Sequence, residues 1–510
     1  MLRVFQSDLY DPDKFVVTLE LVPGRESAGR GIDMVIGIAA DAFSDGRISA
    51  VSMTDNPGGN PALSPDVLGH EIFKLGMDVI VHFTCRDTNR VGMESRALQL
   101  AMMGMKNILA LTGDYSGKGF GGQGAPVFDI DSVQLQILLS VLNDRLHDSG
   151  DPDDFLTGCA VSPFKYTEAE SFSQYAKLCR KAAAGAQFVI TQLGYDIHKY
   201  LELLKMMRRL NLDIPVLGSV YILTPAAARI MNTGKVPGAF VTDELLRQVE
   251  REWRNPDDGR KAAIERAAQL TAVLKGLGYK GVHLSGIHRK FDMVGEILNR
   301  LPDYEEQWES LLHLLTFSPP GGFYAFPKKT TEPIYGKRTH QLKFFEKVKF
   351  DFLRRSHDVF FNRENVLAPL FRKLCYFFQG SLGERILLDI MEDPLKRMML
   401  DCQRCGDCGI QHVGFLCPES GCPKHMRNGA CGGSHNGRCE VYPERYCIWV
   451  RAYARLANIG RVDELIQGCV PPRMWELNQT SSWFNYHLQR DHQGASNAIS
   501  QRCRLQHCRI

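Results

Sequence analysis

The N-terminal half of the chain repeats one pattern that limits its possible folds. A short apolar run rich in β-branched residues is followed by a turn and then by a stretch with helical spacing. The eight runs begin at Phe15, Ile48, Asp78, Asn107, Leu156, Phe188, Ile214 and Gly281. Near-continuous apolar strands that alternate with helices are typical of a parallel sheet covered by helices. Eight such units predict an α/β chain with a (β/α)8 TIM barrel.

A doubly wound open sheet is the alternative fold. It is disfavoured because no Gly-x-Gly-x-x-Gly follows the first run. The glycine-rich stretch YSGKGFGGQGAP follows the fourth run and lacks the Gly-Lys-Ser/Thr ending of a phosphate-binding loop. We therefore interpret that stretch either as a mobile loop over a site or as a long surface loop.

The barrel pattern stops near Leu315, which divides the chain into three regions. Residues 1–315 are expected to form the barrel, and residues 316–395 a linker followed by amphipathic helices with basic side chains. Residues 396–510 form a cysteine-rich region with a C-terminal tail, because eight of the fifteen cysteines fall between Cys402 and Cys447. Such clustering indicates metal or cluster binding in a reducing compartment.

Composition and charge exclude several classes of protein. The hydrophobic share of 44% and the charged share of 23% are typical of a globular protein. The net charge of +3 gives no strong attraction to nucleic acid or to an anionic membrane. The N-terminal residues show no signal-peptide core, and no apolar run is long enough to span a bilayer. We expect a cytoplasmic protein with no membrane span and no nucleic-acid partner.

The spacing of the cysteines suggests two metal sites. The first three have C-x₂-C-x₂-C spacing, and a later Cys-Pro pair can complete a [4Fe–4S] site, which gives the set Cys402, Cys405, Cys408 and Cys417. The remaining four are enough for a tetrahedral zinc or a second cluster, namely Cys422, Cys431, Cys439 and Cys447. Spacing does not decide between iron–sulfur and zinc, and a purely structural zinc module is the alternative.

Polar residues end several of the predicted strands, where a packed core would exclude them. They are Glu20, Thr54, His82, Thr84, Asp114, Gln192, His288 and Arg289. In a TIM barrel the C-terminal ends of the strands meet at one mouth, so these side chains predict a shared polar site there. Burial of Glu20 in its apolar run would raise its pKa and make it a candidate general acid.

The same segments resemble the methylenetetrahydrofolate reductase family, in the same order and with the same spacing. The matching motifs are LELVPGR at Leu19–Arg25, VSMTDNP at Val51–Pro57, HFTC at His82–Cys85, LTGD at Leu111–Asp114, AGAQFVITQLGYD at Ala184–Asp196 and HLSGIHR at His283–Arg289. The resemblance covers about residues 10–295 and implies a flavin-dependent barrel that interconverts 5,10-methylenetetrahydrofolate and 5-methyltetrahydrofolate.

The resemblance also implies roles for individual residues. Glu20 matches the family's general acid, and Asp114 matches the aspartate beside the flavin and the pterin. FAD, with FMN as the alternative, would be bound by the set Thr54, His82, Thr84, Gly113, Asp114 and Lys181. The tetrahydrofolate substrate would be bound by Gln192, Tyr221 and Arg289. We also expect a homo-oligomer.

Two segments depart from the family pattern. The loop after the fifth run reads AVSPFKYTE, where the family has a Tyr-Pro segment and a flavin-contacting histidine. The segment LGSVYILTPAAA after the seventh run lacks the family's phenylalanine that stacks on nicotinamide or folate. These departures leave open FAD or FMN as cofactor, and NAD(P)H or a redox protein as the electron partner.

The cysteine-rich region is similar to the accessory protein that accompanies, or is fused to, methylenetetrahydrofolate reductase in anaerobic one-carbon pathways. The shared features are CxxCGxC, CPxxxCPK, NGxCGG, GxCEV and CIWVRAY. There an iron–sulfur centre is thought to pass electrons to the flavin, which favours electron transfer here. The alternative is a folate-dependent methyltransferase on a TIM barrel with a structural zinc domain, which would need no flavin.

Overall fold

The computed structural model describes residues 4–151, 153–287, 289–327, 330–336, 342–362, 364–466 and 468–495. Eight parallel strands close into a barrel in the order β1-β2-β3-β4-β7-β8-β9-β10, with β10 pairing back onto β1. This confirms the predicted TIM barrel. The strands are β1 Val16–Leu21, β2 Ala50–Met53, β3 Val79–Thr84, β4 Asn107–Leu111, β7 Leu156–Val161, β8 Phe188–Thr191, β9 Val216–Tyr221 and β10 Gly281–Ser285.

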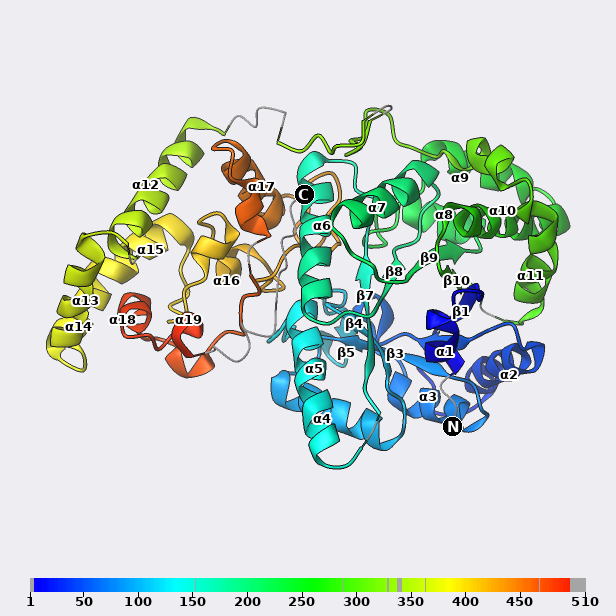
Figure 1. The fold of residues 1–510 in the computed structure, drawn as a ribbon, viewed down its shortest axis with the longest axis horizontal. Coiled ribbons are helices and arrows are strands. Elements are labelled where there is room, and N and C mark those ends of the chain that lie inside the picture. Colours follow the sequence, from blue (N-terminus) through cyan, green and yellow to red (C-terminus); the bar gives the residue numbers. More distant parts are fainter. Residues whose placement is uncertain are drawn as a thin grey trace.

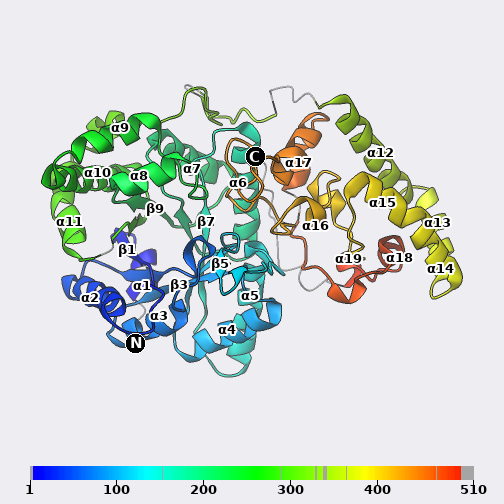
Figure 2. The same ribbon diagram turned by 180° about the vertical axis from the view of Figure 1, so that it is seen from behind.

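Helices cover the outside of the barrel, and α1 (Val4–Tyr10) precedes the first strand (Figures 1 and 2). Because the strands contact helices on one face and each other's side chains on the other, they are buried along nearly their whole length. The outer helices are α2 Arg30–Asp45, α3 Pro65–Lys74, α4 Arg90–Met102, α5 Ser132–Asp148, α6 Glu168–Ala183, α7 Ile197–Arg209, α8 Pro225–Asn232, α9 Asp243–Glu252, α10 Pro256–Leu277 and α11 Asp292–Glu305.

The glycine-rich loop after β4 forms a two-stranded hairpin, β5 (Lys118–Gly119) and β6 (Gly122–Gln123). Its backbone meets the short helix η1 (Pro57–Gly59) after β2, where Gly117 donates its N–H to the carbonyl of Gly59 at 2.9 Å. The loop therefore belongs to the C-terminal end of the barrel, as the strand order requires.

The segment that follows the barrel packs against the barrel before the chain continues into the C-terminal region. After η2 (Trp308–Leu315), the Tyr324 hydroxyl donates to Asp196 at 2.6 Å, and the Ala325 N–H donates to the buried Glu202 at 2.6 Å. Asp196 caps α7 and Glu202 lies on it, so this part of the predicted linker is fixed to that helix.

The C-terminal region lies beside the barrel and consists of short helices and loops (Figure 1). Helices α12 to α15 form its outer edge, away from the barrel, in both views. Its elements are α12 Phe344–Phe360, α13 Leu367–Phe378, α14 Leu382–Ile386, the π-helical η3 Leu387–Glu392, α15 Asp393–Leu400, η4 Ile410–Val413, α16 Pro418–Gly421, α17 Ile448–Ala457, η5 Val462–Leu465, η6 Trp475–Leu477, α18 Ser482–His487 and α19 His492–Ala495. Among the described residues, no helix is both long and apolar enough to cross a bilayer.

Buried hydrogen bonds join this region to α5 and α6. Asp131 begins α5 with a capping box, and its second carboxylate oxygen accepts the backbone N–H and the side-chain amide of Asn428 at 3.0 and 3.1 Å. The Tyr453 hydroxyl on α17 donates to Glu168 at the start of α6 at 2.7 Å. Because these polar groups are buried and hydrogen-bonded to each other, they fix the position of the C-terminal region on the barrel.

Candidate functional site

A cavity of about 530 Å³ opens at the C-terminal mouth of the barrel. This volume lies within the range of pockets that hold a cofactor or a small substrate. Eight of the barrel residues predicted from the sequence line it, namely Glu20, Thr54, His82, Thr84, Gly113, Asp114, Lys181 and Gln192. The C-terminal region closes one side of the cavity with residues between Lys424 and Glu440.

The floor of the cavity brings together a carboxylate and two imidazoles. The ligand atoms of Glu20, His82 and His283 lie within 4.8 Å of one another, and Glu20 Oε2 is 3.8 Å from His283 Nε2. His283 Nδ1 lies 2.8 Å from the Thr18 hydroxyl, which fixes the ring. Glu20 thus sits beside groups that can hydrogen-bond to it, while about a quarter of its side chain (27%) stays exposed to the cavity side.

Two buried polar atoms on this floor lack partners within the described part of the chain. They are the Thr54 hydroxyl and His82 Nε2. Burial lowers the pKa of His82 to about 4, so the ring is neutral near neutral pH. Buried polar atoms are rarely left unsatisfied in a native protein, so these two atoms fit a bound polar ligand.

The ends of β3 and β4 form one wall. The backbone N–H and hydroxyl of Thr84 donate to Asp55 at 3.1 and 2.9 Å, and Asp114 accepts the Gly58 N–H at 3.0 Å. Gly113 has φ +89°, and a Cβ there would lie 3.0 Å from that of Thr84. A glycine is therefore needed at this turn, which presents Asp114 to the cavity.

Lys181 and Gln192 reach the cavity at the next two strands around the barrel, β7 and β8. Lys181 Nζ donates to the Ala160 carbonyl at 2.6 Å, and burial lowers the pKa of this lysine to about 8. The Gln192 amide donates to the Pro237 carbonyl at 3.0 Å and accepts the Leu193 N–H at 2.9 Å. The Gln192 side chain is thereby held at the rim of the cavity, with one of its two amide hydrogens engaged.

Two predicted binding residues do not line the cavity. Tyr221 is the partly buried last residue of β9, where burial and the nearby charge of Glu20 raise the pKa of its phenol. Arg289 is exposed in the turn after β10 and does not line the cavity, and its role in folate binding stays a prediction. His288, also expected there, lies outside the described residues.

Sequence reasoning missed several residues of the site. His283 was visible as a polar residue in the run GVHLS but was not separated from its apolar neighbours. Lys424, Cys431 and Glu440 come from the C-terminal region, and no local pattern places them at the barrel. Lys424 Nζ donates to the Gly113 carbonyl at 2.8 Å and pairs with Glu440 at 2.5 Å, so it links the two parts of the chain at the cavity wall.

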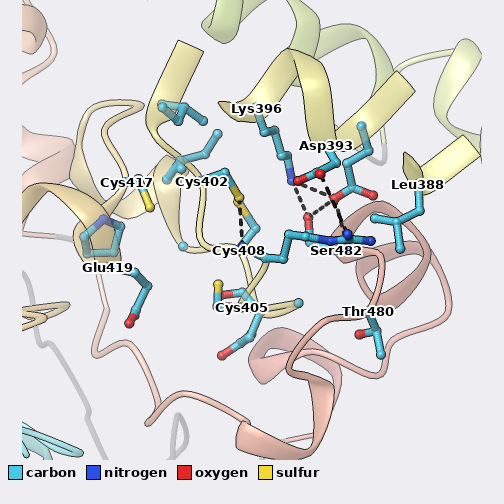
Figure 3. A pocket seen from close by; sticks show the side chains of 18 residues that line it. Leu388, Asp393, Lys396, Cys402, Cys405, Cys408, Cys417, Glu419, Thr480 and Ser482 are labelled. Atoms are coloured by element: carbon cyan, nitrogen blue, oxygen red, sulfur yellow. Dashed lines mark hydrogen bonds and ion pairs between the residues drawn. The ribbon is translucent and has the colours of Figure 1, made fainter. Parts of the chain in front are cut away.

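The eight clustered cysteines form two groups in the structure. The side chains of the first group, Cys402, Cys405, Cys408 and Cys417, surround one small enclosed cavity beside α15 (Figure 3). Burial raises the pKa of Cys417 to about 11, and its interactions with the Cys408 and Cys402 thiols add to the shift. We call these four residues the outer cysteine set.

The second group is Cys422, Cys431, Cys439 and Cys447, which we call the inner cysteine set. Burial raises the pKa of Cys431 to about 12, and the neighbouring Glu440 and Cys422 contribute. Cys447 interacts in turn with Cys431 and Cys422, and Cys422 with Cys439. Since Cys431 lines the barrel cavity, the inner set lies at the mouth of the barrel.

The chain matches two known families. The family described as "Methylenetetrahydrofolate reductase" matches residues 6–302, and the one described as "Methylene-tetrahydrofolate reductase C terminal" matches residues 386–476. A Caenorhabditis elegans protein named probable methylenetetrahydrofolate reductase (NADPH) is 24% identical over 269 residues, which cover 51% of this chain and 39% of that protein. The chain therefore spans well under half of that relative's length.

Two further similarities are more limited. A Pectobacterium carotovorum protein named 5,10-methylenetetrahydrofolate reductase is 22% identical over 217 residues, or 42% of this chain and 67% of that protein. A solved Clostridium thermocellum structure, described as an uncharacterized protein that binds two copies of 5-methyl-5,6,7,8-tetrahydrofolic acid, aligns with a TM-score of 0.41 and 11% identity. That alignment covers 59% of this chain and 99% of the other.

Proposed function

The chain belongs to the methylenetetrahydrofolate reductase family. From this premise we propose that it interconverts 5,10-methylenetetrahydrofolate and 5-methyltetrahydrofolate in the barrel cavity, with a bound flavin, and exchanges electrons through the cysteine-rich region. The observation that carries the proposal is the meeting of the acid Glu20, Asp114 and the inner cysteine Cys431 in one cavity.

The cavity suits a flavin in its polar groups as well as its volume. The unpartnered Thr54 hydroxyl and His82 Nε2 offer hydrogen bonds to the heteroatoms of a ring system. Burial lowers the pKa of Lys181 to about 8, and an anionic or polar ligand beside it would favour its cationic form. Thr54, His82 and Lys181 would hold the cofactor, and the Gly113 turn would let it approach the backbone. A bound flavin supplies a carrier for electrons taken singly or in pairs.

Glu20 is the general acid in this proposal. It donates a proton to the nitrogen of the five-membered ring of methylenetetrahydrofolate as the ring opens, and it recovers the proton in the reverse direction. His283, held by Thr18, lies 3.8 Å from the Glu20 carboxylate and orients it. Gln192 and Asp114 both line the cavity and position the pterin, since both offer hydrogen-bonding groups to its edge.

The two cysteine sets are proposed as iron–sulfur sites fused to the barrel as its electron module. In the outer set, C-x₂-C-x₂-C spacing followed by Cys417-Pro418 resembles the way ferredoxin-like runs complete a [4Fe–4S] site. The inner set offers four thiolates, which are enough for a second cluster or for a tetrahedral zinc. The sequence spacing therefore supports a cluster in the outer set, and zinc is the alternative for the inner set.

The test is the visible spectrum of anaerobically purified protein before and after the addition of 5-methyltetrahydrofolate. We expect a flavin band that bleaches on addition, above a broad iron–sulfur absorbance. The matched variant Glu20→Gln keeps the size of the side chain and should keep the flavin. It should slow the bleaching by about 10²- to 10⁴-fold, the usual contribution of a general acid.

Direct chemical reduction of the flavin should be equal in the Glu20→Gln variant and the unmodified protein, because it needs no acid at the folate. Absence of flavin, or a flavin that stays oxidised with methyltetrahydrofolate, would overturn the proposal in favour of a folate-dependent methyltransferase. Zinc in place of iron would retain the barrel chemistry and remove the electron route.

A further inference from the structure

A second large cavity, distinct from the barrel cavity, lies on the C-terminal region. Its volume is about 730 Å³, and it lies between the start of α12, the end of α15 and the loop before α17. One cysteine of each set lines it, Cys417 from the outer set and Cys439 from the inner set. We call this cavity the basic cleft.

Positive charge dominates the lining of the basic cleft. Asp401 and Glu444 are its acidic residues, against five basic ones, Lys343, Lys349, Arg438, Arg445 and Arg451. Two guanidinium groups lie over tyrosine rings, Arg438 at 4.0 Å from the Tyr446 centroid and Arg445 at 5.0 Å from that of Tyr442. These stacked pairs hold the charges at the rim of the cleft.

Exposed apolar side chains adjoin these charges. Phe344, Phe345 and Val348 on α12 are 73%, 83% and 50% exposed, and they fall between Lys343 and Lys349 in the sequence. Tyr442 and Tyr446 are 40% and 54% exposed. Aromatic residues beside a charged rim are typical of a protein interface, and an exposed apolar patch of this kind marks an interaction site.

We propose that the basic cleft and the adjoining Phe344, Phe345 and Val348 dock an acidic one-electron carrier protein. The inference rests on the proposed function, since it assumes that the cysteine sets carry electrons to and from the flavin. A carrier seated there faces a ligand of each cysteine set at once. The positive rim would steer an acidic partner to the point where electrons can enter or leave.

The exposure of the lining favours a protein over a small cofactor. Pockets for small ligands enclose most of the ligand surface, with largely buried walls. Here the Arg445 side chain is 67% exposed and that of Arg451 is 41% exposed, and both tyrosines face solvent. Such a surface can be covered only by a partner that is itself large.

The test uses the full-length holoenzyme and a reduced acidic ferredoxin as the probe, with reduced methyl viologen as a small donor that needs no docking site. The variant Lys343→Glu/Arg445→Glu reverses two exposed charges of the cleft. We expect it to reduce the rate of flavin reduction by ferredoxin at least tenfold at low salt and to flatten its salt dependence. The viologen-driven rate should not change.

The matched control is Arg247→Glu/Arg251→Glu, which reverses two exposed charges on α9, far from the cleft in sequence and on the barrel. It should leave both rates unchanged. The docking proposal is overturned if ferredoxin reduces the cleft variant as fast as the unmodified protein. It is also overturned if the variant changes the oligomeric state, which would make the cleft a contact between copies, or if it weakens reduction by NADH, which would make it a nucleotide site.

The same experiment separates this inference from the proposed function. If methyl viologen cannot exchange electrons with the flavin of the unmodified protein, then the electron route through the cysteine sets fails. If viologen succeeds and the cleft variant has no effect on ferredoxin, then only the docking site fails.

Discussion

Asn428 holds the C-terminal region over the barrel mouth, and its replacement by alanine tests that arrangement. The side chain is fully buried, and its amide donates to Asp131 at 3.1 Å and to the Val470 carbonyl at 3.0 Å. Its oxygen accepts the Val470 N–H at 2.6 Å. Asn428→Ala removes all three bonds while the backbone N–H of residue 428 still reaches Asp131.

The expected cost follows from which groups lose their partners. The Val470 N–H is left unsatisfied, at about 1–3 kcal/mol, and Asp131 loses one bond to a charged acceptor, at about 1.5–3 kcal/mol. The Val470 carbonyl still accepts a hydrogen bond from the Gln134 amide at 2.8 Å, so the loss of its bond to Asn428 costs little free energy. Only the Asp131 bond crosses from the C-terminal region to the barrel. Its loss should raise the population of the undocked state roughly 10- to 100-fold, since 1.4 kcal/mol is a factor of ten.

Hydrogen exchange of the segment 424–433 measures this opening, because those amides exchange when the segment leaves the barrel. The matched control is Asn143→Ala, which removes a 2.9 Å bond to the Phe155 N–H within the barrel and should leave the segment protected. Viologen-driven flavin reduction should slow in Asn428→Ala, since Cys431 leaves the cavity with its segment. Exchange no faster than in the control would refute the role given to this contact.

Two further predictions concern the barrel floor and the cysteine sets. Burial lowers the pKa of His82 from 6.5 to about 4, so the unfolded chain takes up a proton that the folded chain resists. The free energy of unfolding should therefore fall by about 3 kcal/mol from this group as the pH drops from 6.5 to 4. When urea unfolding is measured at pH 7 and at pH 4, the free energy of unfolding of the His82→Gln variant should fall by that much less between the two pH values than that of the unmodified protein. Cys405→Ser and Cys431→Ser should each remove the iron of one set, and only the second should abolish the equilibration of viologen with the flavin. Equal iron content in both variants and in the unmodified protein would contradict the assignment of the two sets.

The barrel could be predicted from sequence because its signals are local. Each strand is an apolar run, and the run beginning at Phe188, for example, becomes β8 at Phe188–Thr191. The polar site followed from the same reasoning, since parallel strands end at one edge and Glu20, His82 and Gln192 stand near such ends. The grouping of the cysteines could be predicted for a similar reason, because short spacing in the sequence holds Cys402, Cys405 and Cys408 together.

The contacts between the two regions could not be predicted because they join distant residues whose local roles are already filled. The sequence around Asp131 predicts a helix cap, and nothing in that sequence indicates that Asp131 also binds Asn428, 297 positions away. His283 was not predicted as a site residue because it lies in an apolar strand. Its partner Thr18 is on another strand. The role of Arg289 stays a prediction, because a turn after a strand end does not fix the direction of a long, exposed side chain.

The loop after β7 lies where the C-terminal region meets the barrel. Lys165 in that loop is buried, and its Nζ donates to the Ser434 carbonyl. Gly238, on the loop that holds Gln192, approaches the Gly432 carbonyl so closely that a Cβ would lie 3.3 Å from it. The mouth of this barrel is thus completed by the cysteine-rich region and not by its own loops alone.

This arrangement makes the two regions depend on each other. Without the cysteine-rich region, Lys165, Asp131 and Glu168 would lose partners that match them in the buried interface. Water could satisfy these groups again, but the apolar surface beside them, including Phe172 against Tyr453 at 5.0 Å between ring centroids, would be exposed. The cavity would lose the wall that carries Lys424 and Cys431. The same contacts that stabilise the docked state therefore place the inner cysteine set at the proposed flavin site.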